Sequence, residues 1–217
     1  MTATTIVLVN GEPPTHPVAC AALASASRLV CGDGAYRRAL ALGRAPDLVV
    51  GDGDSLSETD KVALGSRWVQ IAEQDTNDLD KAFRTVLKRF DEVGHIVILG
   101  AGGLREDHFL GNLFRLPGFA RLVPQVEMIT NAGVFTVVLE ERTYACRPRE
   151  AVSVFAPERE THVSSSGLEW PLDGVPLAEL WMGTLNRTTG SSFTLRTDRP
   201  LIVYRPHAVR ANQPEEL

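Results

Sequence analysis

Short apolar runs alternate with segments of helical periodicity over about the first 125 residues. The apolar runs are rich in β-branched residues and end at polar or glycine turns, which predicts strands at 5–10, 28–33, 47–52, 67–72 and 95–100. The helix-compatible segments are 17–26, 35–42, 57–64, 78–90 and 106–115. Strands that are apolar throughout and are joined through helices predict a mostly parallel sheet covered on both faces.

The pattern changes near residue 125, where helical periodicity disappears. Eight short strand candidates follow, with turn signals between them, at 125–130, 133–139, 142–147, 151–156, 161–166, 167–172, 192–197 and 201–206. Regular short strands of this kind predict a β-sandwich or a small barrel. Because the stretch near 140–150 is charged and contains proline, we place the domain boundary there, and we expect an α/β domain over residues 1–142 and an all-β sandwich domain over 143–217. The last residues, ANQPEEL, are expected to fray.

Aspartates cluster at the ends of the apolar runs. Ten of the twelve lie between Asp33 and Asp107, and six of these ten are in the segments VCGDG (30–34), VVGDGDS (49–55), QDTND (74–78) and REDH (105–108). Parallel sheets bind ligands at the carboxyl ends of their strands. Mg²⁺ takes oxygen ligands and usually keeps phosphate oxygens among them. The pattern therefore predicts a site for divalent cations and a polyphosphate.

The segment GDGDS (51–55) is the sharpest local signal. Gly51 and Gly53 allow a tight turn, so that Asp52 and Asp54 converge on one point. Two converging anions repel each other and normally persist when a cation offsets them. The alternative is an Asp-rich turn in which Asp54 or Ser55 caps a helix over 57–64.

The segment EQDTNDLDKAF (73–83) opens the fourth predicted helix. Thr76 or Asn77 is a plausible N-cap, and first-turn carboxylates favour the positive end of the helix dipole. Ordinary helix initiation is enough to explain Asp75 and Asp80. It explains less well why Asp78 and Lys81, three residues apart, place a metal-type ligand and a phosphate-type cation on one face.

The segment ILGAGGLREDHFLGN (98–112) runs from a strand through a glycine turn into a helix. Gly102 and its neighbouring glycines can bring backbone N–H groups close to an anion, although the Gly-Lys-Ser/Thr ending of a Walker A loop is missing. Arg105 supplies a forked phosphate donor beside Asp107, another candidate ligand. His108 is either part of the site or a structural histidine at a helix start.

Composition narrows the function classes. The chain has 217 residues, 44% of them hydrophobic, and carries a net charge of −5, which argues against a dedicated nucleic-acid binder. No apolar stretch approaches the roughly 20 residues of a membrane span, and the N-terminus lacks a basic region of the signal-peptide kind. The three cysteines lack CxxC spacing, which favours reduced thiols in a cytoplasmic protein over disulfides or a zinc site.

The four motifs together carry a resemblance to a known family. CGDGAYR, PDLVVGDGDS, EQDTNDLDKA and GAGGLREDHFLGN, in this order and spacing, resemble the motifs of thiamine pyrophosphokinase, most closely a bacterial subgroup. In the second half, the segments VSVFAP, SSGLEWPL and LWMGTLN resemble the C-terminal β-domain of the same family. The resemblance therefore covers nearly the whole chain. It implies Mg²⁺-dependent transfer of a diphosphate from ATP to the hydroxyethyl group of thiamine, with release of AMP. It also implies an α/β domain for ATP and Mg²⁺, a β-sandwich for thiamine binding and dimerisation, and a homodimer.

The resemblance, together with the motif chemistry, gives each candidate residue an expected role. The expected catalytic residues are Asp54, Asp78, Arg105 and Asp107, and the expected metal ligands are Asp52, Asp54 and Asp78. The expected ATP-binding residues are Asp33, Gln74, Asn77, Lys81, Gly102, His108 and Asn112, and those for thiamine are Thr184 and Asn186. The chain departs from the family pattern at three places. Many members have an aromatic residue in place of Gly53 and Thr in place of Asn77, and GTSNE is frequent where this chain has GTLNR.

Other functions and another role for the tryptophans stay open. A pyrophosphokinase for another heterocyclic alcohol, such as a hydroxymethylpterin, fits the same chemistry. A glycosyltransferase that uses Asp52-Gly53-Asp54 as a DxD site would not need the other acidic motifs, and a non-enzymatic nucleotide-binding regulator would be expected to have lost a ligand. Trp170 and Trp181 either wall the thiamine site, at an interface that includes 180–187, or belong to the core of the β-domain.

Overall fold

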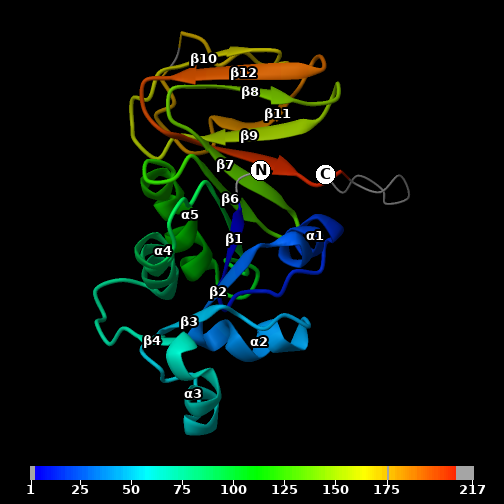
Figure 1. Ribbon diagram of the computed structural model, residues 1–217. Helices are drawn as coiled ribbons and strands as arrows, with labels where there is room; N and C mark the ends of the chain where they lie inside the picture. Colours follow the sequence, from blue (N-terminus) through cyan, green and yellow to red (C-terminus); the bar gives the residue numbers. More distant parts are fainter. Residues whose placement is uncertain (1–2, 175, 209–217) are drawn as a thin grey trace. The chain divides into compact units, whose positions relative to one another are not determined.

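The computed structural model describes residues 3–174 and 176–208 (Figure 1). The chain divides into two compact units, Met1–Asn131 and Ala132–Leu217. The predicted boundary after residue 142 therefore comes too late. The strand Gly133–Val138 pairs with Leu201–Pro206 and belongs to the second unit. The predicted fraying of ANQPEEL falls outside the described residues.

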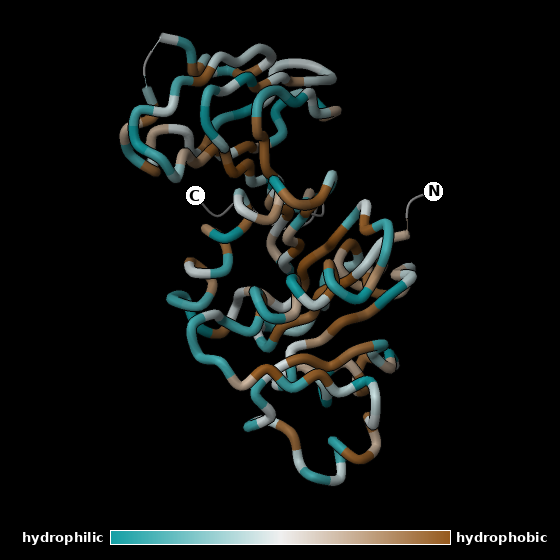
Figure 2. The backbone as a smooth tube through the Cα atoms, turned by 60° about the vertical axis from the view of Figure 1, so that its left-hand side comes forward, coloured by the Kyte–Doolittle hydropathy of each residue, from teal (hydrophilic) through white to brown (hydrophobic). Residues whose placement is uncertain are grey.

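The first unit contains a fully parallel six-stranded sheet. Its spatial order is β6-β5-β1-β2-β3-β4, and every neighbouring pair is parallel. The strands are β1 (Thr4–Leu8), β2 (Arg28–Gly32), β3 (Leu48–Gly51), β4 (Trp68–Gln70), β5 (His95–Leu99) and β6 (Gln125–Ile129). In Figure 2 the strands of this sheet run as hydrophobic segments and the turns at their ends are largely hydrophilic, as expected for a sheet buried on both faces.

Five α-helices connect these strands. They are α1 (Pro17–Ser25), α2 (Tyr36–Ala41), α3 (Glu58–Leu64), α4 (Asp78–Arg89) and α5 (Glu106–Ala120), with 3₁₀ turns η1 (Asp33–Ala35) and η2 (Gly65–Arg67). Figure 1 shows α1 and α2 on one side of the sheet and α4 and α5 on the other. The rings of Phe83 and Phe119 stack with centroids 4.0 Å apart, which joins α4 to α5. Among the described residues, none of the helices combines the length and apolar character that a membrane span needs.

The second unit is a sandwich of two antiparallel sheets. One has the order β11-β9-β13-β7 and the other β10-β12-β8. The strands are β7 (Gly133–Val138), β8 (Glu141–Ala145), β9 (Ala151–Phe155), β10 (Val163–Ser166), β11 (Gly183–Arg187), β12 (Ser192–Thr197) and β13 (Leu201–Pro206). Buried side chains of both sheets, including the stacked rings of Tyr144 and Phe193, form its core. The predicted fold class, a parallel α/β unit followed by an all-β sandwich, is confirmed.

Two strand predictions in this half need correction, and one strand was missed. The segment 125–130 is not part of the sandwich, because β6 pairs parallel to β5 in the first unit. The segment 167–172 is not a strand and makes one isolated bridge, Leu168 to Thr188. The sequence pattern also missed β11, whose register shifts between Gly183 and Asn186 where Leu185 takes a left-handed φ of 59°. A bulge of this kind hides the period-two alternation that marks a strand.

Candidate functional site

The predicted acidic motifs all follow carboxyl ends of the parallel sheet. Asp33 follows β2, the GDGDS segment follows β3, residues 74–78 follow β4 and the glycine turn follows β5. Parallel strands end at a common edge of the sheet, so segments far apart in sequence meet there. The strand order therefore explains why these motifs form one site.

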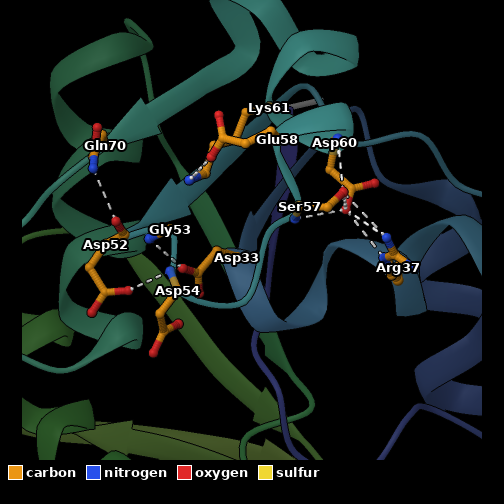
Figure 3. Close-up of polar contacts among 10 residues, drawn as sticks. All are labelled: Asp33, Arg37, Asp52, Gly53, Asp54, Ser57, Glu58, Asp60, Lys61 and Gln70. Atoms are coloured by element: carbon orange, nitrogen blue, oxygen red, sulfur yellow. Dashed lines mark hydrogen bonds and ion pairs between the residues drawn. The ribbon is translucent and has the colours of Figure 1, made fainter.

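Asp33 holds the GDGDS loop in place (Figure 3). Its carboxylate is buried and accepts hydrogen bonds from the backbone N–H groups of Gly34, at 2.7 Å, and Gly53, at 2.9 Å. A Cβ atom at Gly51 would overlap this carboxylate, and Gly53 has a φ of 91° that favours glycine. The two glycines are thus required by a close approach and by a left-handed turn, as the sequence predicted.

Three carboxylates converge at this loop. One oxygen atom from each of Asp33, Asp52 and Asp54 lies within 4.8 Å of the others. Gln74 donates a hydrogen bond of 2.8 Å to Asp52, and this bond is the largest cause of the lowered pKa of Asp52. Burial raises the pKa of Asp33, with a smaller contribution from the charges of Asp52 and Asp54. The predicted metal ligands were Asp52, Asp54 and Asp78, whereas the carboxylate that lies beside Asp52 and Asp54 is that of Asp33.

The alternative explanation of Asp54 as a helix cap is wrong. Helix α3 is capped by Ser57, whose hydroxyl accepts from the N–H of Asp60 while the Asp60 carboxylate accepts from the N–H of Ser57. Asp54 instead lies exposed at the cluster, and its carboxylate accepts a 2.9 Å hydrogen bond from Ser55. Helix initiation therefore does not account for the converging carboxylates.

The two carboxylates in the first turn of α4, Asp78 and Asp80, have different surroundings. Asn77 is the N-cap and accepts from the N–H of Asp80 at 2.9 Å. The buried Asp80 carboxylate forms a forked ion pair with Arg115 of α5, at 2.6 and 2.9 Å. Asp78 takes no part in these contacts. Desolvation raises the pKa of Asp78, and the nearby charge of Asp33 adds to the rise. The sequence analysis missed Arg115, because a pair 35 residues apart leaves no local signal.

A cavity of about 400 Å³ brings most of the expected ATP-binding residues together. Of the predicted site residues, the lining includes Gln74, Asn77, Asp78, Lys81, Asp107, His108 and Asn112. Asn77 donates to the side chain of Asn112 at 3.1 Å, and Asn112 donates to the carbonyl of Ala101 at 3.1 Å. These two bonds tie α4, α5 and the glycine turn around one cavity.

The glycine turn is shaped by packing. A Cβ atom at Gly102 would lie 2.8 Å from the Phe109 ring, and the Gly102 carbonyl accepts from the N–H of Glu12 at 2.7 Å. Arg105 and Asp107 form an exposed forked ion pair at 2.6 and 3.1 Å. The Arg105 guanidinium lowers the pKa of Asp107 to about 2, so this carboxylate is charged at neutral pH. Anion binding by Gly102 and Arg105 stays a prediction.

The two residues expected on the thiamine side lie in and beside the β11 bulge. The buried Asn186 side chain accepts from the N–H of Trp170 and donates to its carbonyl at 2.6 Å, so it holds the Trp170 loop. Thr184 donates to the carbonyl of Trp181 at 2.7 Å. Trp170 is 52% exposed and Trp181 is 72% exposed, so neither belongs to the core of the sandwich.

The residues at the acidic cluster fit a hard divalent cation. They offer carboxylate oxygens from separate strand ends, and the raised pKa of the buried Asp33 reflects burial and, to a smaller degree, anionic neighbours that a cation would offset. Asp52 and Asp54 direct their carboxylates outward from the loop that Asp33 fixes (Figure 3). The arrangement is therefore able to bind a cation together with an anionic ligand.

Comparisons with known proteins agree with these observations. The model of the thiamin pyrophosphokinase catalytic domain matches residues 20–127, and that of the thiamin pyrophosphokinase substrate-binding domain matches residues 133–204. A crystal structure of thiamine pyrophosphokinase from Bacillus subtilis is 23% identical and has a TM-score of 0.75, over 94% of this chain and 100% of that one. One from Geobacillus thermodenitrificans is 24% identical with a TM-score of 0.73, over 94% and 98%. The yeast enzyme is 17% identical with a TM-score of 0.73, over 94% and 86%. No curated protein matches the sequence.

Proposed function

Because this chain belongs to the thiamin pyrophosphokinase family of enzymes, we propose that it transfers a diphosphate from ATP to thiamine and releases AMP. The observation that carries the proposal is the cluster of Asp33, Asp52 and Asp54 beside the cavity that Asp78 and Lys81 line. Diphosphate transfer requires an anionic chain held in line with an alcohol and charge compensation on its oxygens. A cation site next to a cavity with a lysine supports that chemistry.

The acidic residues divide the work of this reaction between them. Asp52 and Asp54, with Asp78 from α4, would hold Mg²⁺, which when bound neutralises charge on the polyphosphate. Asp33 positions the loop, since both of its oxygens accept backbone N–H groups. Lys81, and Arg105 from the glycine turn, would contact the phosphates. Asp54 or Asp78 would accept the proton of the attacking hydroxyl.

The proposed products give the direct test. With ATP, Mg²⁺ and thiamine, we expect AMP as the first nucleotide product and an acceptor that gains two phosphates in one step. Mass spectrometry of the acceptor and chromatography of the nucleotide check both at early times. ADP as the first product would indicate γ-phosphoryl transfer and would contradict the proposal. A panel of hydroxyalkyl heterocycles that includes a hydroxymethylpterin separates thiamine from the competing acceptor, and the preferred acceptor is the one with the highest kcat/KM.

The thiamine side of the reaction is assigned to the second unit and to a homodimer. A flat, partly apolar cation needs aromatic or aliphatic walls, and Trp170, Trp181 and Leu185 are all exposed around β11. Leu185 is 81% exposed on the bulge, an unusual position for a leucine unless another surface covers it. These exposures support an interface between two copies of the chain that includes residues 180–187.

We expect Leu185→Glu to dissociate the dimer, because a carboxylate cannot be buried in an apolar contact without a large desolvation cost. Light scattering after gel filtration measures the mass, and steady-state kinetics should show a larger rise in KM for thiamine than for ATP. Val62→Glu is the matched control, since Val62 is also 81% exposed but lies on α3 of the first unit. A wild-type protein that is monomeric at micromolar concentration and fully active would refute this assignment.

A further inference from the structure

A second cavity, of about 460 Å³, lies along α4 and beside the segment that follows β4. Val69 and Ile71 supply apolar lining from β4 and the residues after it. Lys81, Arg84 and Lys88, spaced three and four residues apart on one face of α4, supply cations. The cavity is distinct from the one that holds Asp78 and Asp107, and Lys81 and Thr76 line both.

The lining of this cavity is positively charged although the chain is acidic. Four cationic residues, Arg89 included, line it against two carboxylates, while the whole chain carries −5. One of the carboxylates, Glu73, is already engaged, since it accepts from the backbone N–H groups of Asp75 and Thr76 at 2.7 and 3.0 Å. A concave surface with an excess of cations attracts anions.

The helix dipole explains only two of these four cations. Lys88 and Arg89 stand in the last turn of α4, where cations are favoured by the helix dipole. Arg84 lies in the middle of the helix, and Lys81 lies close to its N-terminus, where a cation opposes the dipole. Within residues 3–174 and 176–208, none of these four side chains forms a hydrogen bond or ion pair.

Lys81 connects the two cavities, since it lines both of them. Lys81 is only 3% exposed. Among the described residues, no carboxylate lies within ion-pair distance of its ammonium group. The charge of Lys81 acts on the carboxylates of Asp52, Glu73 and Asp78, but none of the three forms an ion pair with it. Because Lys81 lines both cavities, an anion in either one is able to supply the missing partner.

We propose that the cavity along α4 is a second anion site, which binds a phosphorylated small molecule and shares Lys81 with the site for ATP. Arg84 and Lys88 would contact the phosphate group, and Val69 and Ile71 would contact an apolar part of the ligand. An anion bound there competes for the Lys81 ammonium and so weakens the hold on the polyphosphate of ATP. This coupling rests on the proposed function, whereas the existence of the site does not.

Inorganic pyrophosphate in EDTA tests the site directly. Without a divalent cation the acidic cluster repels pyrophosphate, so the electropositive cavity is left as its binding site. Calorimetry of the full chain should show one saturable site, and Arg84→Gln/Lys88→Gln should bind at least about tenfold more weakly because two charge-assisted contacts are lost. Arg147→Gln/Arg149→Gln removes the same charge from the second unit and should bind as wild type. No saturable binding, or equal loss in both double variants, overturns the proposal.

Steady-state kinetics show whether the cavity is a separate anion site or a part of the ATP site. Arg84→Gln/Lys88→Gln should keep kcat and the KM for ATP within about twofold of wild type, since neither residue touches the acidic cluster. A rise in the KM for ATP would mean that the cavity holds part of the substrate nucleotide, and would overturn a separate site. Lys81→Gln should weaken both pyrophosphate binding in EDTA and the use of ATP. An effect on ATP alone would overturn the coupling, and pyrophosphate binding stays measurable even in a chain that fails to phosphorylate thiamine.

Discussion

Asp52→Asn and Asp54→Asn are each expected to lower kcat/KM at saturating Mg²⁺ by at least about 1,000-fold, because a bound metal contributes several kcal/mol to the transition state. Asn keeps the shape and the hydrogen-bond acceptor of Asp but removes the charge that holds the cation. Both side chains lie on the open side of the loop that Asp33 fixes, so the fold should persist. Circular dichroism and steady-state kinetics with varied Mg²⁺ measure the two effects.

The matched control for these variants is Asp91→Asn. Asp91 is exposed in the same unit, and among the described residues it lies outside the acidic cluster. Asp91→Asn should retain wild-type kinetics. Mg²⁺ should also stabilise it against unfolding as much as it stabilises the wild type, because an ion that binds the folded state stabilises that state. The two-carboxylate clamp is wrong if either Asp52→Asn or Asp54→Asn keeps most of the wild-type activity.

Asp54→Asn should also make the metal-free protein more stable. Burial raises the pKa of Asp33 and of Asp78 above their unfolded values, so the folded state binds protons more tightly. The contribution of these two groups to folding stability is fully present below their unfolded pKa. It is lost as the pH rises through the raised pKa of each group in the folded state. Removing the charge of Asp54 reduces the repulsion that contributes to both shifts. Thermal unfolding in EDTA should therefore show a smaller loss between acid and neutral pH in Asp54→Asn.

The parallel half of the fold was predictable because its signals are local. The central strands β1, β2, β3 and β5 are largely apolar runs. Helix α4 likewise carries its signals locally, in the cap Asn77 and the buried Leu79 and Phe83. The acidic motifs follow strands that all end at one edge, so the fold class placed them together without knowledge of any side-chain contact. This is why the cavity contains seven of the expected residues.

The sequence failed where long-range contacts decide. Residues 167–172 have the composition of a strand, but Asn186 fixes the Trp170 backbone across 16 residues in a loop. Strand β6 has the residues of a sandwich strand, and its parallel pairing with β5 assigns it to the first unit. In the site, Asp33 joins Asp52 and Asp54 because it accepts the N–H of Gly53, a contact between segments 20 residues apart.

The Asp80–Arg115 pair carries the second large prediction. Arg115→Met keeps the apolar stem of the side chain but leaves the buried Asp80 carboxylate without its forked donor. We expect a loss of about 2–3 kcal/mol in the free energy of unfolding, which is less than for a fully buried pair because Arg115 is 45% exposed. The thermal midpoint should fall by about 5–10 °C. Calorimetry and urea unfolding measure both quantities.

Two further variants identify the unpaired charge as the cause. Asp80→Asn/Arg115→Gln replaces the ion pair with two amides, leaves no buried charge, and should recover most of the lost stability. Arg37→Met breaks the pair of Arg37 with Asp60, in which the Arg37 side chain is 72% exposed, and should cost less than about 1 kcal/mol. A loss in Arg115→Met no larger than in Arg37→Met would contradict the buried-charge argument. Because the Asp80–Arg115 pair joins α4 to α5, whose first turns carry Asp78 and Asp107 into one cavity, Arg115→Met should also lower kcat/KM while Arg37→Met does not.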